Sequence, residues 1–102
     1  MYDLRVAPDA VADLDEALVY LASVDVELMF DLQDEVDAFF LAISERPLSF
    51  QRHSGGPARR AFLNKFQYGI YFLIDADTVV VLGIFHFRDD PEKIAGRVGG
   101  AA

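Results

Sequence analysis

The sequence contains no cysteine among its 102 residues. Disulfide frameworks and cysteine-based zinc sites are therefore excluded. Only two histidines are present, His53 and His86, and their isolation argues against a zinc cluster. Common enzyme signatures are also missing, because the chain has no glycine-rich phosphate loop, no GxSxG and no HExxH. We expect no metal and no cofactor.

Targeting segments are missing as well. The N-terminus lacks the basic start and apolar run of a signal peptide. The longest apolar stretch, residues 79–85, is broken by Gly83 and is far too short to span a bilayer. We expect a cytoplasmic protein that does not enter a membrane. The hydrophobic fraction of 53% and the nine phenylalanines suffice for one folded domain over residues 1–102.

Charge is distributed unevenly along the chain, whose net charge is −8. Residues 1–45 carry twelve acids and one base, whereas residues 46–74 carry five bases and no acid. Binding to a phosphate backbone depends on cationic side chains, so a chain this acidic should not bind nucleic acid non-specifically. The acidic half is most simply a solvated helical face.

The N-terminal half has the pattern of one strand and two helices. Residues 2–7 alternate between apolar and polar, which predicts a strand. Pro8 and Asp9 then mark a helix start, and Asp25 is suited to cap a second helix. That second helix should end before Pro47, because the residue ahead of a proline avoids the α region. Two helices with so short a connection predict an antiparallel hairpin.

The C-terminal half is extended. Residues 48–58 form a surface loop, and residues 60–66, 68–74 and 79–87 are rich in aromatic and β-branched side chains. Residues 75–78 form a turn between the last two strands. Gly83 suggests a bulge or the close approach of another backbone.

The expected fold class is α+β with the order β-αα-βββ. An N-terminal strand precedes an antiparallel helical hairpin, and a three-stranded antiparallel meander follows. We expect one antiparallel sheet with the hairpin covering one face. Residues 96–102 are expected to be a frayed tail.

Several residues of the meander could carry chemistry, but each signal is weak alone. His86 and Arg88 have the same parity, so a general acid or base could stand beside a phosphate-binding cation. The same pattern also fits a structural role, in which His86 packs against aromatic neighbours and Arg88 is a cation at the rim of the sheet. Arg59 and Arg60 point to opposite faces, and the tyrosines Tyr68 and Tyr71 are more often core or interface rings than proton donors. The acids Asp13, Asp15 and Glu16 are interpreted as solubilising.

Taken in order, these features resemble a known family. The likeness begins with residues 6–10 leading into Asp13 and Leu14, and continues through the long second helix. It is densest in RRAFLNKFQYGIYF, residues 59–72, and in VLGIFHFR, residues 81–88, followed by Pro91 and Arg97. In these segments the chain resembles the RelE/ParE toxins of bacterial type II toxin–antitoxin operons, and is more similar to the ParE branch.

The resemblance implies one of two activities. ParE-like members inhibit DNA gyrase by protein contact, whereas RelE-like members cut messenger RNA on the ribosome. The second activity needs cations at the scissile phosphate, but here Asp89 and Asp90 follow Arg88 and the net charge is −8. We therefore expect gyrase inhibition without catalysis. The RelE-like alternative uses His86, Arg88, Arg59 and Arg60 as its catalytic residues, and a third alternative is a non-toxic module that only binds an antitoxin.

The expected partners are a cognate antitoxin and DNA gyrase, with no direct binding of nucleic acid unless the RelE-like alternative holds. The antitoxin should lie along the hairpin and the sheet. The candidate partner-binding residues are Arg59, Arg60, Lys65, Tyr68, Tyr71, His86, Arg88, Arg97, Met29 and Phe30.

Overall fold

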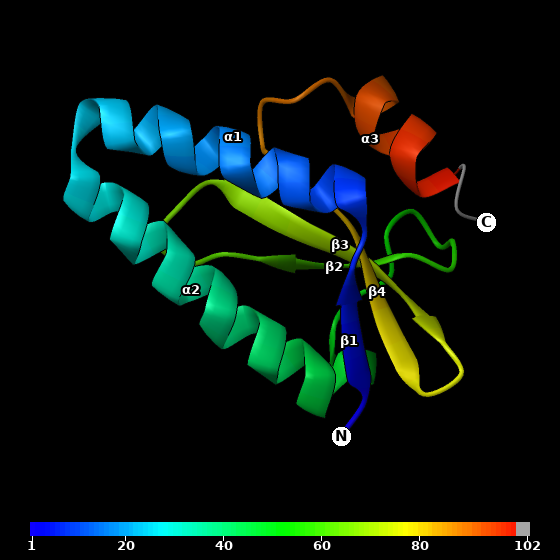
Figure 1. Ribbon diagram of the computed structural model, residues 1–102. Coiled ribbons are helices and arrows are strands. Elements are labelled where there is room, and N and C mark those ends of the chain that lie inside the picture. Colours follow the sequence, from blue (N-terminus) through cyan, green and yellow to red (C-terminus); the bar gives the residue numbers. More distant parts are fainter. Residues whose placement is uncertain (100–102) are drawn as a thin grey trace.

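The computed structural model describes residues 1–99 and confirms the α+β class and the expected order β-αα-βββ. Strand β1 (Asp3–Val6) leads into helices α1 (Pro8–Val24) and α2 (Val26–Glu45), and a short 3-10 turn, η1 (Pro47–Ser49), follows. Strands β2 (Arg59–Phe62), β3 (Tyr68–Asp75) and β4 (Thr78–His86) come next. Figure 1 shows the two long helices joined by a tight turn and lying beside the sheet.

Local signals explain the helical hairpin. Pro8 occupies the first turn of α1, where a missing N–H costs nothing. As predicted, Asp25 caps α2, because its side chain accepts a hydrogen bond of 2.9 Å from the Glu27 N–H. The helix ends at Glu45, before Pro47.

The sheet is mixed, which corrects the prediction of a purely antiparallel sheet. Its strand order is β1-β4-β3-β2. The β2–β3 and β3–β4 pairs are antiparallel, but β1 runs parallel to β4, with Val6 opposite Val81. The helical hairpin lets β2 start in the same direction as β1, and after two antiparallel turns β4 runs in that direction again, so β1 and β4 pair in parallel.

Both faces of the sheet are packed. One face and the two long helices enclose the main core, which contains Leu32, Val36, Ile43, Phe72 and Val81. The opposite face carries a second cluster formed by Tyr71, Leu82, Phe85 and Val98.

The second cluster is completed by a residue of a helix that the sequence pattern does not predict. Helix α3 (Pro91–Gly99) contributes Val98, which is buried against the sheet. The prediction of a frayed tail is therefore wrong for residues 96–99, and residues 100–102 lie outside the described residues. No helix in residues 1–99 is both long enough and apolar enough to cross a membrane.

Candidate functional site

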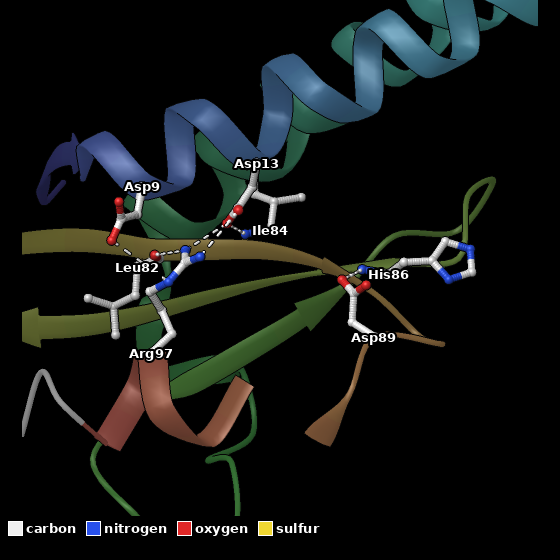
Figure 2. Close-up of polar contacts among 7 residues, drawn as sticks. All are labelled: Asp9, Asp13, Leu82, Ile84, His86, Asp89 and Arg97. Carbon is white, nitrogen blue, oxygen red and sulfur yellow. Dashed lines mark hydrogen bonds and ion pairs between the residues drawn. The ribbon is translucent and has the colours of Figure 1, made fainter. Parts of the chain in front are cut away.

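Where β1 ends, side chains take the place of a neighbouring strand and accept hydrogen bonds from the outer edge of β4. Beyond Val81, β4 has no strand on that side. The Ile84 N–H donates to Asp13 Oδ2 at 3.1 Å, and the His86 N–H donates to Asp89 Oδ2 at 2.9 Å. Figure 2 shows these carboxylates beside the strand, Asp13 from α1 and Asp89 from the turn after β4. The exposed polar groups of an edge strand are thereby satisfied within the chain.

Arg97 belongs to the same arrangement. Its Nη1 donates to Asp13 Oδ2 at 2.8 Å and to the Leu82 carbonyl oxygen at 3.1 Å, and its Nε lies 3.9 Å from Asp9. The hydrogen bond to Asp13 raises the pKa of the Arg97 guanidinium. Figure 2 shows the side chain reaching from α3 towards α1. This candidate partner-binding residue thus fixes α3 to α1, and its side chain is only 22% exposed.

A polar cleft of about 400 Å³ adjoins this edge. Its walls include Tyr68, His86 and Arg88. The rings of Tyr68 and His86 meet edge to face with centroids 5.0 Å apart. The Arg88 N–H donates to His86 Nδ1 at 3.0 Å, so the proton of a neutral His86 ring lies on Nε2. The cleft therefore unites three of the predicted residues.

The cleft also contains three carboxylates, from Asp13, Glu16 and Asp89. Burial raises the pKa of the Tyr68 hydroxyl, and the negative charges of Asp89 and Glu16 contribute to the same shift. An anion in this cleft would be close to these carboxylates, and Arg88 and Lys93 are its only lining lysine or arginine residues within the described chain. The arrangement disfavours a phosphate ligand.

The opposite face of the sheet presents aromatic rings beside a cation. Phe62 and Phe87 pack edge to face with centroids 5.1 Å apart and are 44% and 53% exposed. The Arg60 guanidinium lies 5.0 Å from the centroid of the Phe62 ring, and its Nη1 donates to His53 Nδ1 at 3.2 Å. Exposed aromatic rings with an adjacent arginine are typical of protein-binding hot spots. We refer to Arg60, Phe62 and Phe87 as the aromatic patch.

The remaining predicted residues lie elsewhere. Arg59 donates through Nη1 to the Phe50 carbonyl oxygen at 2.7 Å. Lys65 is exposed, and its backbone N–H donates to the Glu35 carboxylate at 3.1 Å. Tyr71 is buried beside Phe85. Met29 packs partly against the main core, whereas Phe30 is exposed.

The four residues of the RelE-like alternative do not converge. His86 lies opposite Tyr68 on β3 and Arg59 lies opposite Phe72, a separation of about 13 Å along the strand. Arg60 faces the side opposite to His86, because its neighbour Ala61 packs in the main core. One substrate phosphate cannot contact all four side chains in this arrangement.

Sequence reasoning missed the role of Asp13, which it interpreted as solubilising. The spacing contained a signal, because Asp13 lies three residues after Ala10 and four before Ala17, both buried on α1. An acid on the buried stripe of a helix needs a polar partner.

Among residues 1–99, no three His, Cys, Asp or Glu side chains are grouped so that they could hold a metal ion.

Comparisons with known proteins place the fold. No protein-family model matches the sequence, and no curated protein is significantly similar to it. A solved structure of the chromosomal ParDE toxin–antitoxin system from P. aeruginosa matches with a TM-score of 0.73 at 17% identity, over 84% of this chain and 96% of that chain. The chain has a RelE/ParE fold. The toxin–antitoxin complex RelBE2 from Mycobacterium tuberculosis also matches, with a TM-score of 0.57 at 22% identity, over 86% of this chain and 93% of that chain.

Proposed function

We propose that this RelE/ParE-fold protein is the toxin of a type II toxin–antitoxin system. It acts in the cytoplasm by inhibiting DNA gyrase through protein contact, and a cognate antitoxin neutralises it. The shared fold supports the toxin assignment. The separation of the four candidate catalytic residues over two faces of the sheet supports inhibition by contact over catalysis.

The aromatic patch is the part of the surface best suited to contact a target. Phe62 and Phe87 hold one another in place, so little side-chain entropy is lost when a partner covers them. Arg60 adds a cation that is already oriented by the Phe62 ring.

A supercoiling assay with purified, antitoxin-free chain tests this proposal. We expect the wild type to inhibit gyrase, and Phe62→Ser with Phe87→Ser to weaken inhibition about tenfold or more. Leu48→Ser is the matched control, because it removes an exposed apolar side chain away from the aromatic patch. Unimpeded supercoiling at high excess of the wild type would contradict gyrase inhibition.

The RelE-like alternative has one supporting observation, namely that His86, Tyr68 and Arg88 meet in the polar cleft. It requires codon-specific cuts in ribosome-bound message, detected by primer extension and abolished by His86→Ala. A chain that only binds its antitoxin would neither inhibit gyrase nor cut message. Growth arrest on expression, with rescue by the neighbouring gene, distinguishes a toxin from such a module.

A further inference from the structure

Two arginines face each other at the edge of the sheet that β2 forms. Strand β2 is the outermost strand on this side, and residues 51–53 run antiparallel along it, with Arg52 opposite Arg59. Backbone hydrogen bonds of 3.0 and 2.8 Å lie on either side of this pair. The pair therefore occupies the kind of antiparallel position at which opposing side chains come closest, on the same face of the two strands.

Within the described chain, no acid is paired with either arginine. The ion pairs of residues 1–99 are those of Arg97, and residues 46–74 contain no acid. Arg59 Nη1 donates to the Phe50 carbonyl oxygen at 2.7 Å, which orients the guanidinium but leaves its charge in place. Arg52 is exposed. Like charges directly opposite one another destabilise a sheet, so an anion from outside the chain would relieve this repulsion.

The pair lines a depression of about 490 Å³. This volume is within the ordinary range of small-molecule sites, about 300–1,000 Å³. The loop after Arg52 contributes Gly55 and Gly56, and a Cβ added at Gly55 would meet no atom within 4 Å, so this wall is open to a ligand. The apolar residues Leu48 and Ile74 also line the depression.

The charge of this depression distinguishes it from the polar cleft. No aspartate or glutamate is among the described residues that line it, whereas the polar cleft contains three carboxylates. Because the Debye length is about 8 Å at physiological ionic strength, charges that line the depression act more strongly on a ligand than charges elsewhere on the chain. The depression therefore favours an anion.

Charge and size select among anions. A guanidinium forms paired hydrogen bonds with phosphate oxygens, and a phosphate monoester carries a charge of about −1.5 to −2 at neutral pH, which two arginines balance. A carboxylate or a phosphodiester carries only one charge. A nucleic acid strand would also extend beyond the depression over a chain of net charge −8, which repels it.

We propose that Arg52 and Arg59 form a site for a phosphate dianion, either free phosphate or the terminal phosphate of a small monoester such as a nucleotide. The two guanidiniums bind the phosphate oxygens. Leu48 and Ile74 border the space that an attached organic group would occupy. This phosphate site goes beyond the proposed function and does not depend on it.

The phosphate site and the aromatic patch lie on opposite faces of β2. Arg59 shares a face with Ala61, which packs in the main core, whereas Phe62 shares the other face with Arg60. A ligand at the phosphate site therefore leaves the aromatic patch uncovered.

Calorimetric titrations of the full-length chain test the phosphate site. The probes are inorganic phosphate, AMP, cyclic AMP and adenosine, and NaCl keeps the ionic strength constant so that general screening does not change. We expect AMP to bind at least about tenfold more tightly than cyclic AMP, whose phosphodiester carries one charge, and adenosine not to bind. Tighter binding of AMP than of inorganic phosphate would identify a monoester as the ligand, and equal or weaker binding of AMP would identify the free ion.

Variants of the chain locate the binding. Arg52→Gln removes one of the two charges from an exposed side chain, so it should raise the Kd for phosphate and AMP about tenfold without unfolding the protein. Lys65→Gln removes the same charge from an exposed side chain beyond the far end of β2 and should leave both Kd values unchanged. In thermal unfolding at constant ionic strength, phosphate should raise the Tm of the wild type and of Lys65→Gln more than that of Arg52→Gln. Circular dichroism verifies that each variant is folded.

Three results would overturn the inference. Neither heat nor a Tm shift with millimolar phosphate and AMP would mean that the arginines bind no phosphate. Equal affinity for AMP and cyclic AMP would show that the second charge is not recognised, and equal Kd values for Arg52→Gln and Lys65→Gln would place the anion elsewhere. None of these results bears on gyrase inhibition, which the supercoiling assay tests separately.

Discussion

The ring of Phe85, two residues further along the chain, lies in the space that a side chain at Gly83 would occupy. Pairing with β3 shifts at this point, because Tyr71 lies opposite Gly83 while Phe72 lies opposite Val81. Leu82 is thus the extra residue of a β-bulge, as the sequence predicted from the glycine. The close approach is made by the Phe85 ring and not by another backbone.

Replacing Gly83 with alanine should destabilise the protein. The added Cβ would overlap Phe85 Cε2 and lie 2.7 Å from Phe85 Cζ, and this ring is only 1% exposed and cannot turn aside. We expect Gly83→Ala to lower the free energy of unfolding by about 1–3 kcal/mol in urea denaturation. Gly96→Ala is the control, because no atom lies within 4 Å of its added Cβ and the helix should gain about 0.5–1 kcal/mol. Equal stability of Gly83→Ala and wild type would disprove this account.

At the residue scale, the sequence was informative where a side chain acts on its own neighbourhood. Asp25 and Pro47 act within a few residues, and both were assigned correctly. Asp13 was misread because its partners, Ile84 and Arg97, are 71 and 84 residues away. Only the folded sheet brings those groups together.

At the scale of elements, α1 and α2 are predicted from local sequence, whereas α3 depends on residues far along the chain. Helices α1 and α2 have long apolar periodicities, whereas α3 has nine residues and includes Gly96 and Gly99. Two glycines lower the intrinsic helix propensity, so α3 depends on tertiary contacts. Those contacts are the burial of Val98 and the bond between Arg97 and Asp13.

The length of β2 depends on a remote side chain in a similar way. The sequence predicts a strand over residues 60–66, but β2 ends at Phe62. The backbone N–H groups of Asn64 and Lys65 donate to the Glu35 carboxylate on α2. Residues 64 and 65 are therefore held as a loop although their neighbours favour a strand.

Removing the Asp13 carboxylate should loosen α3 and the edge of β4 together. Asp13→Ala leaves the Ile84 N–H without an acceptor and leaves the Arg97 guanidinium only the Leu82 carbonyl oxygen and the more distant Asp9. We therefore expect a loss of about 1–3 kcal/mol in unfolding free energy. Hydrogen exchange should become faster at the Ile84 amide and across residues 91–99.

Asp15→Ala is the matched control, because Asp15 is exposed on the same helix and should change stability by less than about 0.5 kcal/mol. In the double variant with Arg97→Ala, the two losses should not add, because both substitutions break the same contact. Unchanged exchange at residues 91–99 in Asp13→Ala would show that Arg97 does not hold α3.

At the scale of the whole molecule, the acidic and the basic residues lie in different parts of the fold. The acids gather on the hairpin, while the five bases of residues 46–74 lie in the loop and strands beyond it. This distribution could be counted from the sequence, but the faces of the sheet on which the bases lie could not, because Arg59 and Arg60 lie on opposite faces. The faces occupied by His86 and Arg60 likewise depend on strand register, which composition does not determine.

The repulsion within the hairpin predicts how the protein responds to salt. Raising NaCl from about 20 to about 500 mM shortens the Debye length to a few ångströms and screens repulsion between exposed carboxylates. The partly buried bond between Asp13 and Arg97 is screened much less. We therefore expect the Tm of the wild type to rise with salt.

Asp31→Asn relieves the i,i+4 repulsion with Glu27 and Glu35, so it should raise the Tm at low salt but not at high salt. Asp75→Asn removes one charge outside the hairpin and should show a smaller effect at low salt. A Tm that falls as salt rises would mean that attractive ion pairs, and not the repulsion among the hairpin acids, dominate the electrostatics of the folded chain.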